Sequence, residues 1–231
     1  MTYLTVLSHH GGMSDAEATA RGGTRQDRLR RNSSERRARQ RLDLRRTILD
    51  AATDLFGRQG YEGFSLRQVA EAVGYSPTAI YLHFADKDDL LHHVALEGFR
   101  SFGDELQRAF DGAEDTLGRI CAVGLAYLRF GVAHPVHYRL MFMVRGEFLE
   151  RPNPPGYESV VDSFGVLQRV IDEGLARGDL PPRPPEVYTS YLWSHVHGLV
   201  SLHLATPYFP AEQVEALFLA HMEVLALGVR P

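Results

Sequence analysis

The chain has 231 residues, of which 44% are hydrophobic and 23% are charged. This composition is typical of a globular protein with one sizeable core or two small ones, and it argues against collagen-like, disulfide-scaffold and wholly disordered chains. The single cysteine, Cys121, excludes an intrachain disulfide and is consistent with a reduced compartment. No apolar stretch approaches the ~20 residues that span a bilayer, so we expect a cytoplasmic protein that makes no membrane contact.

The net charge of −4 conceals an uneven distribution of charge. Between Arg21 and Arg46 there are eleven arginines and no lysine, against three acidic residues. Such a basic stretch at one end of an acidic chain is typical of a polyanion-binding arm, although a solvated tail has the same composition. Because residues 1–40 contain few large apolar side chains, we expect a disordered, Arg-rich N-terminal arm.

Helical periodicity begins where this arm ends. Apolar residues recur at helical spacing from Leu44 to Phe56, which predicts an amphipathic helix that begins near Leu42 and ends in the glycine-containing segment 57–60. The next helix begins after Ser65, an N-cap with glutamine three residues later, and Gly74 ends it.

A third, short helix follows the glycine turn. Ser76 is its expected N-cap and Pro77 occupies its first position, where a missing N–H costs nothing. Asp86 is the expected N-cap of a fourth helix that runs to about Phe110. Two short helices joined by a glycine turn are the pattern of a helix-turn-helix.

The third helix has side chains suited to a DNA groove. Thr78 and Ala79 are small enough to let the helix enter a major groove ~12 Å wide. Hydrogen-bonding or cationic groups, suited to phosphates and base edges, surround them: Ser76, Tyr81, His83 and Lys87. A solvated face of an ordinary helical hairpin would show the same pattern.

The remainder of the chain also has helical periodicity, and no segment shows convincing strand alternation. The expected helices cover 117–133, 136–143, 159–177, 187–204 and 214–227, with proline-rich breaks at 151–156 and 181–185. The sequence therefore predicts an all-α protein.

The segment Val69–Leu90, VAEAVGYSPTAIYLHFADKDDL, resembles the signature of TetR-type transcriptional regulators. The resemblance covers roughly residues 43–90. It departs from the family pattern at Val73, where the family usually has alanine, and at Thr78, a position that is often glycine. The substitution at Thr78 should alter which bases are read and not whether DNA is bound.

The resemblance implies a regulator, usually a repressor, that binds operator DNA as a homodimer through its last two helices and responds to a small-molecule effector. It implies a three-helix DNA-binding domain at 41–88 and a helical effector-binding and dimerisation domain at 89–231. The implied phosphate contacts are Ser65, Arg67, Ser76, Tyr81, His83 and Lys87. The implied base contacts are Pro77, Thr78 and Ala79. The basic arm, up to Arg45 and Arg46, would lie along the DNA backbone or enter a minor groove.

A second resemblance lies around Trp193, His197 and Gly198, which are similar to the Trp…His-Gly pattern of one class of TetR-type C-terminal domains. That class implies an all-helical ligand-binding and dimerisation domain. Aromatic and methionine side chains form adaptable apolar cavities, and they also form plain cores. The candidate effector-binding residues are Tyr127, Phe130, Tyr138, Met141, Phe142, Trp193 and His197.

The eleven histidines suggest an alternative, a helical enzyme or metal-binding protein. His134 with His137, or His195 with His197 and His203, are possible ligands, but no cysteine or acidic cluster accompanies them. There is no G-x-S-x-G motif, and Cys121 lies within an apolar helix. We therefore expect no enzyme activity, no metal and no cofactor. The histidine-based alternative and an effector-blind DNA binder both stay open.

Overall fold

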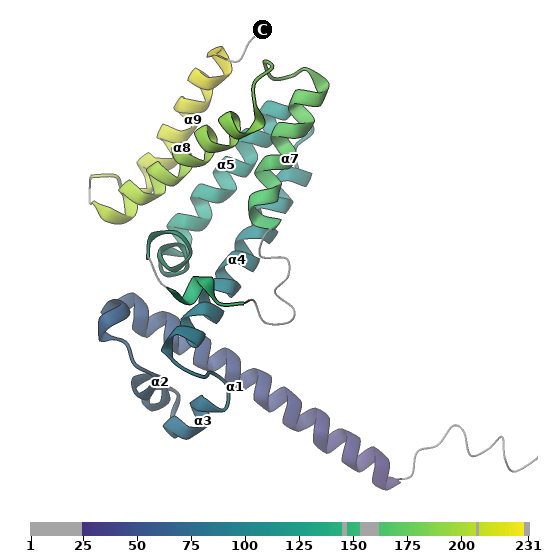
Figure 1. Ribbon diagram of the computed structural model, residues 1–231, viewed down its shortest axis with the longest axis vertical. Helices are drawn as coiled ribbons and strands as arrows, with labels where there is room; N and C mark the ends of the chain where they lie inside the picture. Colours follow the sequence, from purple (N-terminus) through teal and green to yellow (C-terminus); the bar gives the residue numbers. More distant parts are fainter. Residues whose placement is uncertain (1–24, 145–146, 153–161, 207, 229–231) are drawn as a thin grey trace, which may run out of the picture. The chain divides into compact units, whose positions relative to one another are not determined.

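The computed structural model describes residues 25–144, 147–152, 162–206 and 208–228. Every regular element in these ranges is helical, which confirms the predicted all-α class (Figure 1). The chain divides into two units, Met1–Arg46 and Thr47–Pro231, and each is described by itself.

The first unit contains the N-terminal part of helix α1, whose bounds are Arg25–Gly63. The structure differs here from the sequence prediction, because residues 25–40 are helical and not disordered. Arginine, glutamine, alanine and leucine are strong helix formers, so the segment can be helical without burying a face. Leu29 within this segment is 61% exposed, and Leu42 just after it is 66% exposed. The first 24 residues of the predicted arm lie outside the described residues.

The second unit begins with the helices predicted for the helix-turn-helix. The rest of α1 buries Ile48, Leu49 and Phe56, and its regular path is interrupted at Gly60, where φ is 69°. Helix α2 spans Leu66–Val73 and helix α3 spans Pro77–Tyr81. Gly74, between them, has a φ of 73°, a left-handed conformation that favours glycine.

The predicted N-caps are confirmed by their hydrogen bonds. Ser65 Oγ accepts from Gln68 N at 3.3 Å, and Ser76 Oγ accepts from Ala79 N at 3.3 Å. Asp86 Oδ1 accepts from Asp89 N at 2.8 Å and begins helix α4, Lys87–Asp111. Asp86 Oδ2 also accepts from Arg151 Nη2 at 2.9 Å, but each capping bond itself joins residues three apart, so these helix starts follow from local sequence.

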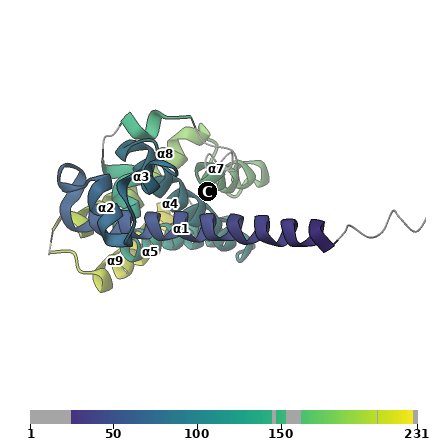
Figure 2. The same cartoon turned by 90° about the horizontal axis from the view of Figure 1, so that it is seen from below.

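The other helices form a bundle around helix α5. The bundle elements are α5 (Thr116–Ala133), α6 (Pro135–Tyr138), a π-helical turn (Arg139–Met143), a 3₁₀ turn η3 (Glu147–Glu150), α7 (Asp162–Arg177), α8 (Pro185–Ala205) and α9 (Ala211–Gly228). Helix α5 contacts α4, α6, α7, α8 and α9, and α8 also contacts α9 (Figures 1 and 2). The single helix expected at 136–143 is thus divided in two, because its second half adopts the wider π-helical turn.

Helix α5 is also more apolar than we expected from the sequence. Among the described residues it is the one helix long and apolar enough to cross a membrane by length and composition. Its side chains Ile120, Val123, Tyr127 and Leu128 are buried among the neighbouring helices. This burial is typical of the central helix of a bundle.

Candidate DNA-binding surface and effector pocket

The short helix α3 is anchored by buried side chains and exposes its other face. Ile80 is fully buried and Phe84, just beyond the helix, is 1% exposed. On the outer side Ser76, Pro77 and Thr78 are exposed. Three large side chains are exposed on the same short segment: Tyr75, Tyr81 and Leu82. The sequence analysis did not name Tyr75 or Leu82 as exposed residues. Leu82 could have been found, because a residue two positions after the buried Ile80 lies on a different face of the helix.

Ala79, His83 and Ser65, which the resemblance also assigned to DNA, are only half-exposed. The Ser65 hydroxyl caps α2 and donates to Gln68 Oε1 at 2.9 Å, so capping already uses this hydroxyl. Arg67 is exposed, with its Nε 3.2 Å from Glu71 Oε1. Exposed pairs of this kind are weak, so the Arg67 guanidinium can turn to a phosphate at little cost.

Lys87 has a structural role that the sequence did not predict. Its Nζ donates to the backbone oxygen of Tyr61 at 2.5 Å and lies 3.8 Å from the centre of the Tyr61 ring. The Tyr61 hydroxyl in turn donates to Asp88 Oδ1 at 2.7 Å. The start of α4 is therefore held against the segment that follows Gly60. An ammonium group has three hydrogens, so this contact leaves donors for a phosphate.

Two of the predicted DNA contacts, Arg45 and Arg46, belong to the first unit, where Arg46 is exposed and Arg45 is half-exposed. The other predicted contacts belong to the second unit, within residues 65–87.

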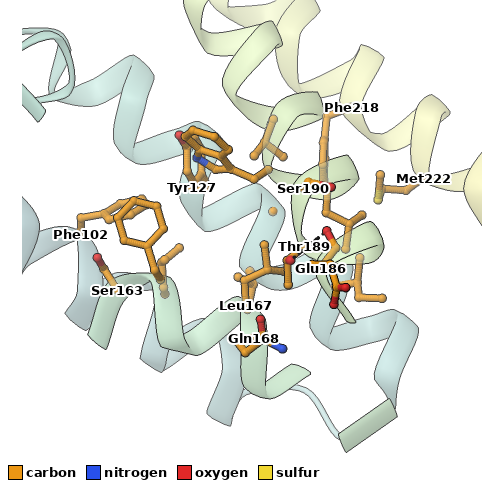
Figure 3. A pocket seen from close by; sticks show the side chains of 18 residues that line it. Phe102, Tyr127, Ser163, Leu167, Gln168, Glu186, Thr189, Ser190, Phe218 and Met222 are labelled. Atoms are coloured by element: carbon orange, nitrogen blue, oxygen red, sulfur yellow. Dashed lines mark hydrogen bonds between the residues drawn. The ribbon is translucent and has the colours of Figure 1, made fainter. Parts of the chain in front are cut away.

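The second unit contains a partly open cavity of about 410 Å³ between α4, α5, α7, α8 and α9 (Figure 3). This volume is within the range of small-molecule sites. Most of the wall is apolar, and Tyr127 and Trp193 line it as predicted. Aromatic rings from three further helices also line it: Phe102, Phe164 and Phe218. Phe102 and Phe218 are buried, whereas Phe164 is 52% exposed. Because the three residues come from α4, α7 and α9, no local pattern in the sequence predicts that they share a cavity.

The other predicted effector residues do not line this cavity. Phe130, Tyr138 and Met141 are buried in the core of the bundle, which favours the alternative that they serve packing. Phe142 and His197 are half-buried behind the wall, where the His197 ring lies 5.3 Å from the Trp193 ring and the Phe142 ring lies 6.0 Å from the Tyr127 ring.

A hydrogen-bonded group behind the wall positions Tyr127. The Tyr138 hydroxyl lies 2.6 Å from His197 Nδ1, and the Tyr127 hydroxyl lies 3.1 Å from the Tyr138 hydroxyl. Burial raises the pKa of Tyr127 to about 12 and lowers the pKa of His197 below its usual value. Both side chains are therefore uncharged at neutral pH, and neither brings a formal charge to the pocket.

The histidines considered as metal ligands contact different partners. His195 Nε2 lies 3.1 Å from His221 Nδ1, His197 contacts Tyr138, and His203 Nδ1 lies 2.6 Å from the backbone oxygen of Phe209. Across the described ranges, no group of three or more histidine, cysteine, aspartate or glutamate residues could hold a metal ion.

Comparisons with protein families agree with the two parts of this architecture. Residues 48–94 match the family described as bacterial regulatory proteins, tetR family, and residues 120–225 match the tetracyclin repressor-like C-terminal domain. The closer resemblance of the C-terminal part to the Trp…His-Gly class stays a prediction.

Curated relatives and solved structures give the same picture. The chain is 30% identical over 166 residues to the transcriptional repressor AcnR of Corynebacterium diphtheriae, covering 68% of this chain and 79% of AcnR. It is 34% identical to the transcriptional regulator HbdR of Aromatoleum sp. over 83 residues, only 36% of either chain. A Rhodococcus sp. RHA1 protein of unknown function has 27% identity and a TM-score of 0.66, over 81% of this chain and 96% of that one.

A second Rhodococcus RHA1 structure, a bacterial regulatory protein in the tetR family, has 21% identity and a TM-score of 0.62, over 78% of this chain and 93% of that chain. At this identity the likeness concerns the fold alone. With both family matches and the AcnR relative, the chain belongs to the TetR family of bacterial regulatory proteins and is a DNA-binding transcriptional regulator.

Proposed function

We propose that this regulator is a cytoplasmic repressor without enzyme activity, which binds operator DNA as a homodimer and leaves it when a small molecule fills the 410 Å³ pocket. The observation that carries the proposal is the exposed outer face of α3, held in place by the buried side chains of Ile80 and Phe84. The relative AcnR is named a transcriptional repressor, which supports repression and not activation by this regulator.

In this proposal the α3 helix enters the major groove. Pro77, Thr78 and Ala79 lie against base edges, because they occupy the start of the helix, where recognition helices read DNA. The phosphate contacts come from the surrounding polar side chains Ser65, Arg67, Ser76, Tyr81, His83 and Lys87. We place the DNA-binding domain at 41–88 and the effector and dimerisation domain at 89–231.

The dimer is proposed to form through α8 and α9. Large apolar side chains are exposed on these two helices: Val187, Tyr191, Leu202, Leu219 and Val224. Two neighbouring helices with exposed apolar residues are the feature expected of an interaction surface. A single small DNA-binding module buries only ~600–1,000 Å² on DNA, so a second copy is needed for a tight operator complex.

The double variant Tyr191→Glu, Leu219→Glu should be monomeric, because each copy would place two carboxylates in an apolar interface without partners. Light scattering during size-exclusion chromatography measures the mass directly. A matched control is Tyr208→Glu, since Tyr208 is 83% exposed and lies outside both helices. A double variant that keeps the dimer mass would show that copies meet elsewhere.

Helix α4 is the proposed connection between pocket and DNA. Its first residue, Lys87, contacts Tyr61, while Phe102 and Leu106, further along the same helix, line the pocket. A ligand that favours one position of α4 would therefore change how α3 is held for contact with DNA. For release, the ligand must bind the DNA-incompetent arrangement more tightly than the competent one.

Footprinting on the DNA that flanks the protein's own gene tests the proposal as a whole. We expect protection of a two-fold symmetric site whose half-sites are separated by about one helical turn or a multiple of it. Affinity should also fall steeply with salt. Binding that shows no preferred site at any salt concentration would contradict the operator assignment.

The arginine-rich segment of α1 should contribute to affinity by neutralising phosphates. Deletion of residues 1–40 removes eight arginines and should make the slope of log affinity against log salt shallower, by about 0.9 for each phosphate that is no longer neutralised. Deletion of residues 1–24, which removes only Arg21 among them, is the matched control and should leave the slope nearly unchanged. Equal slopes for both deletions would show that the helical arginines do not contact DNA.

A further inference from the structure

The polar side chains of the pocket come mainly from two neighbouring helices. Glu186, Thr189 and Ser190 come from the first turns of α8, and Gln168 comes from α7 (Figure 3). Glu186 is the only charged residue among the described side chains that line the cavity, and these include no lysine, arginine or histidine. The net charge of the described side chains that line the pocket is therefore negative.

The hydroxyl groups of the two residues near Glu186 already donate their hydrogens to backbone oxygens of the protein. Thr189 Oγ1 donates to the backbone oxygens of Pro185 and Glu186, both at 3.3 Å, and Ser190 Oγ donates to the backbone oxygen of Val187 at 3.3 Å. A hydroxyl has a single hydrogen, so in this arrangement the two groups present their oxygen lone pairs to a ligand. Together with the Glu186 carboxylate, they make this part of the wall rich in acceptors.

Aromatic rings form a second feature of the wall. The rings of Phe164 and Trp193 lie 6.3 Å apart at 70°, and Tyr127 completes this side of the wall. Such rings provide an apolar wall suited to an aromatic or alkyl body. Behind Trp193, burial lowers the pKa of His197, so this imidazole does not supply a positive charge at neutral pH.

We infer that the pocket takes an apolar organic cation: an aromatic or alkyl body that fills the cavity, with an ammonium group directed to Glu186 and its neighbouring acceptors. The inference rests on the proposed role of the cavity as the effector site. Glu186 is exposed, so a ligand carboxylate beside it would meet a like charge near solvent, and no cation among the described wall residues would offset the repulsion.

Three probes that differ only in their head group test the sign of charge: 4-phenylbutylamine, 4-phenylbutan-1-ol and 4-phenylbutanoate. Trp193 is the only tryptophan of the chain and lines the cavity, so its fluorescence reports occupancy in the intact protein. At neutral pH and constant ionic strength, we expect the amine to bind about tenfold or more tightly than the carboxylate.

The variant Glu186→Gln keeps the shape of the side chain and removes its charge. It should weaken binding of the amine by about fivefold or more and change binding of the alcohol by less than about twofold. Glu212→Gln is the matched control, because Glu212 also lies in the first turn of a helix but does not line the cavity. It should leave all three affinities unchanged.

The inference is overturned if the carboxylate binds as tightly as the amine, if none of the three probes binds, or if Glu186→Gln preserves the preference for the amine. The uncharged fluorophore N-phenyl-1-naphthylamine separates this failure from failure of the effector site itself. If the fluorophore binds and quenches Trp193, the pocket accepts ligands and only the assigned charge is wrong. If it does not bind either, the proposed effector site is wrong as well.

Discussion

Thr78→Glu should lower operator affinity by about two orders of magnitude or more. Thr78 is exposed near the start of α3, at a proposed base contact. A carboxylate there would face phosphates and base acceptors, and removal of a good base contact alone costs ~1–3 kcal/mol. Because a dimer presents α3 twice, the penalty applies at both half-sites. Gel shifts at fixed salt concentration measure the affinity.

The matched control is Ser101→Glu, which places a carboxylate at an exposed position of α4, outside α3. This variant should bind the operator with nearly wild-type affinity, and thermal melts should show that both variants are folded. If Thr78→Glu binds like the control, α3 does not read DNA, and the proposed docking face must be replaced.

Phe102→Ala should lower the free energy of unfolding by about 3–5 kcal/mol. Phe102 is 2% exposed and its ring contacts those of Tyr127, Phe130 and Phe142, at centroid distances of 5.1, 5.1 and 5.7 Å. It also lines the pocket, so the space left by truncation would join an existing cavity that neighbouring helices cannot close by a small shift. Urea unfolding at one fixed protein concentration measures the decrease in stability.

Phe164→Ala is the matched control, because Phe164 lines the same cavity but is 52% exposed. Its truncation removes less buried apolar surface and should cost about 1 kcal/mol or less. Comparable decreases for the two variants would contradict the view that the central aromatic cluster, and not the pocket rim, stabilises the bundle.

The helices of the helix-turn-helix could be predicted from sequence because their signals are local. Ser65, Ser76 and Asp86 each cap the helix that they precede, and Gly74 provides the left-handed turn between two helices. A cap or a turn depends on residues within about one helical turn, so its consequence follows from neighbours in the chain. The helical state of residues 25–40 was missed because the absence of apolar side chains excludes a core and does not exclude a helix.

The pocket could be predicted only in part. Tyr127 and Trp193 line it, but Tyr138 and Met141, of the same chemical types, are buried in the core. An apolar residue at helical spacing is expected to be buried, and its neighbours across the bundle decide whether it meets a side chain or a cavity. Helices α4, α7 and α9 contribute wall residues that no local pattern connects.

The order of residues along the chain thus specified most of the helices and the capped starts of α2, α3 and α4, since these depend on contacts within one segment. The packing of distant helices decided the rest: the Lys87–Tyr61 contact, the hydrogen bond between Tyr138 and His197, and the cavity to whose wall the exposed Glu186 contributes. Those features depend on the directions in which side chains from separate helices meet, and these directions exist only once the bundle has formed.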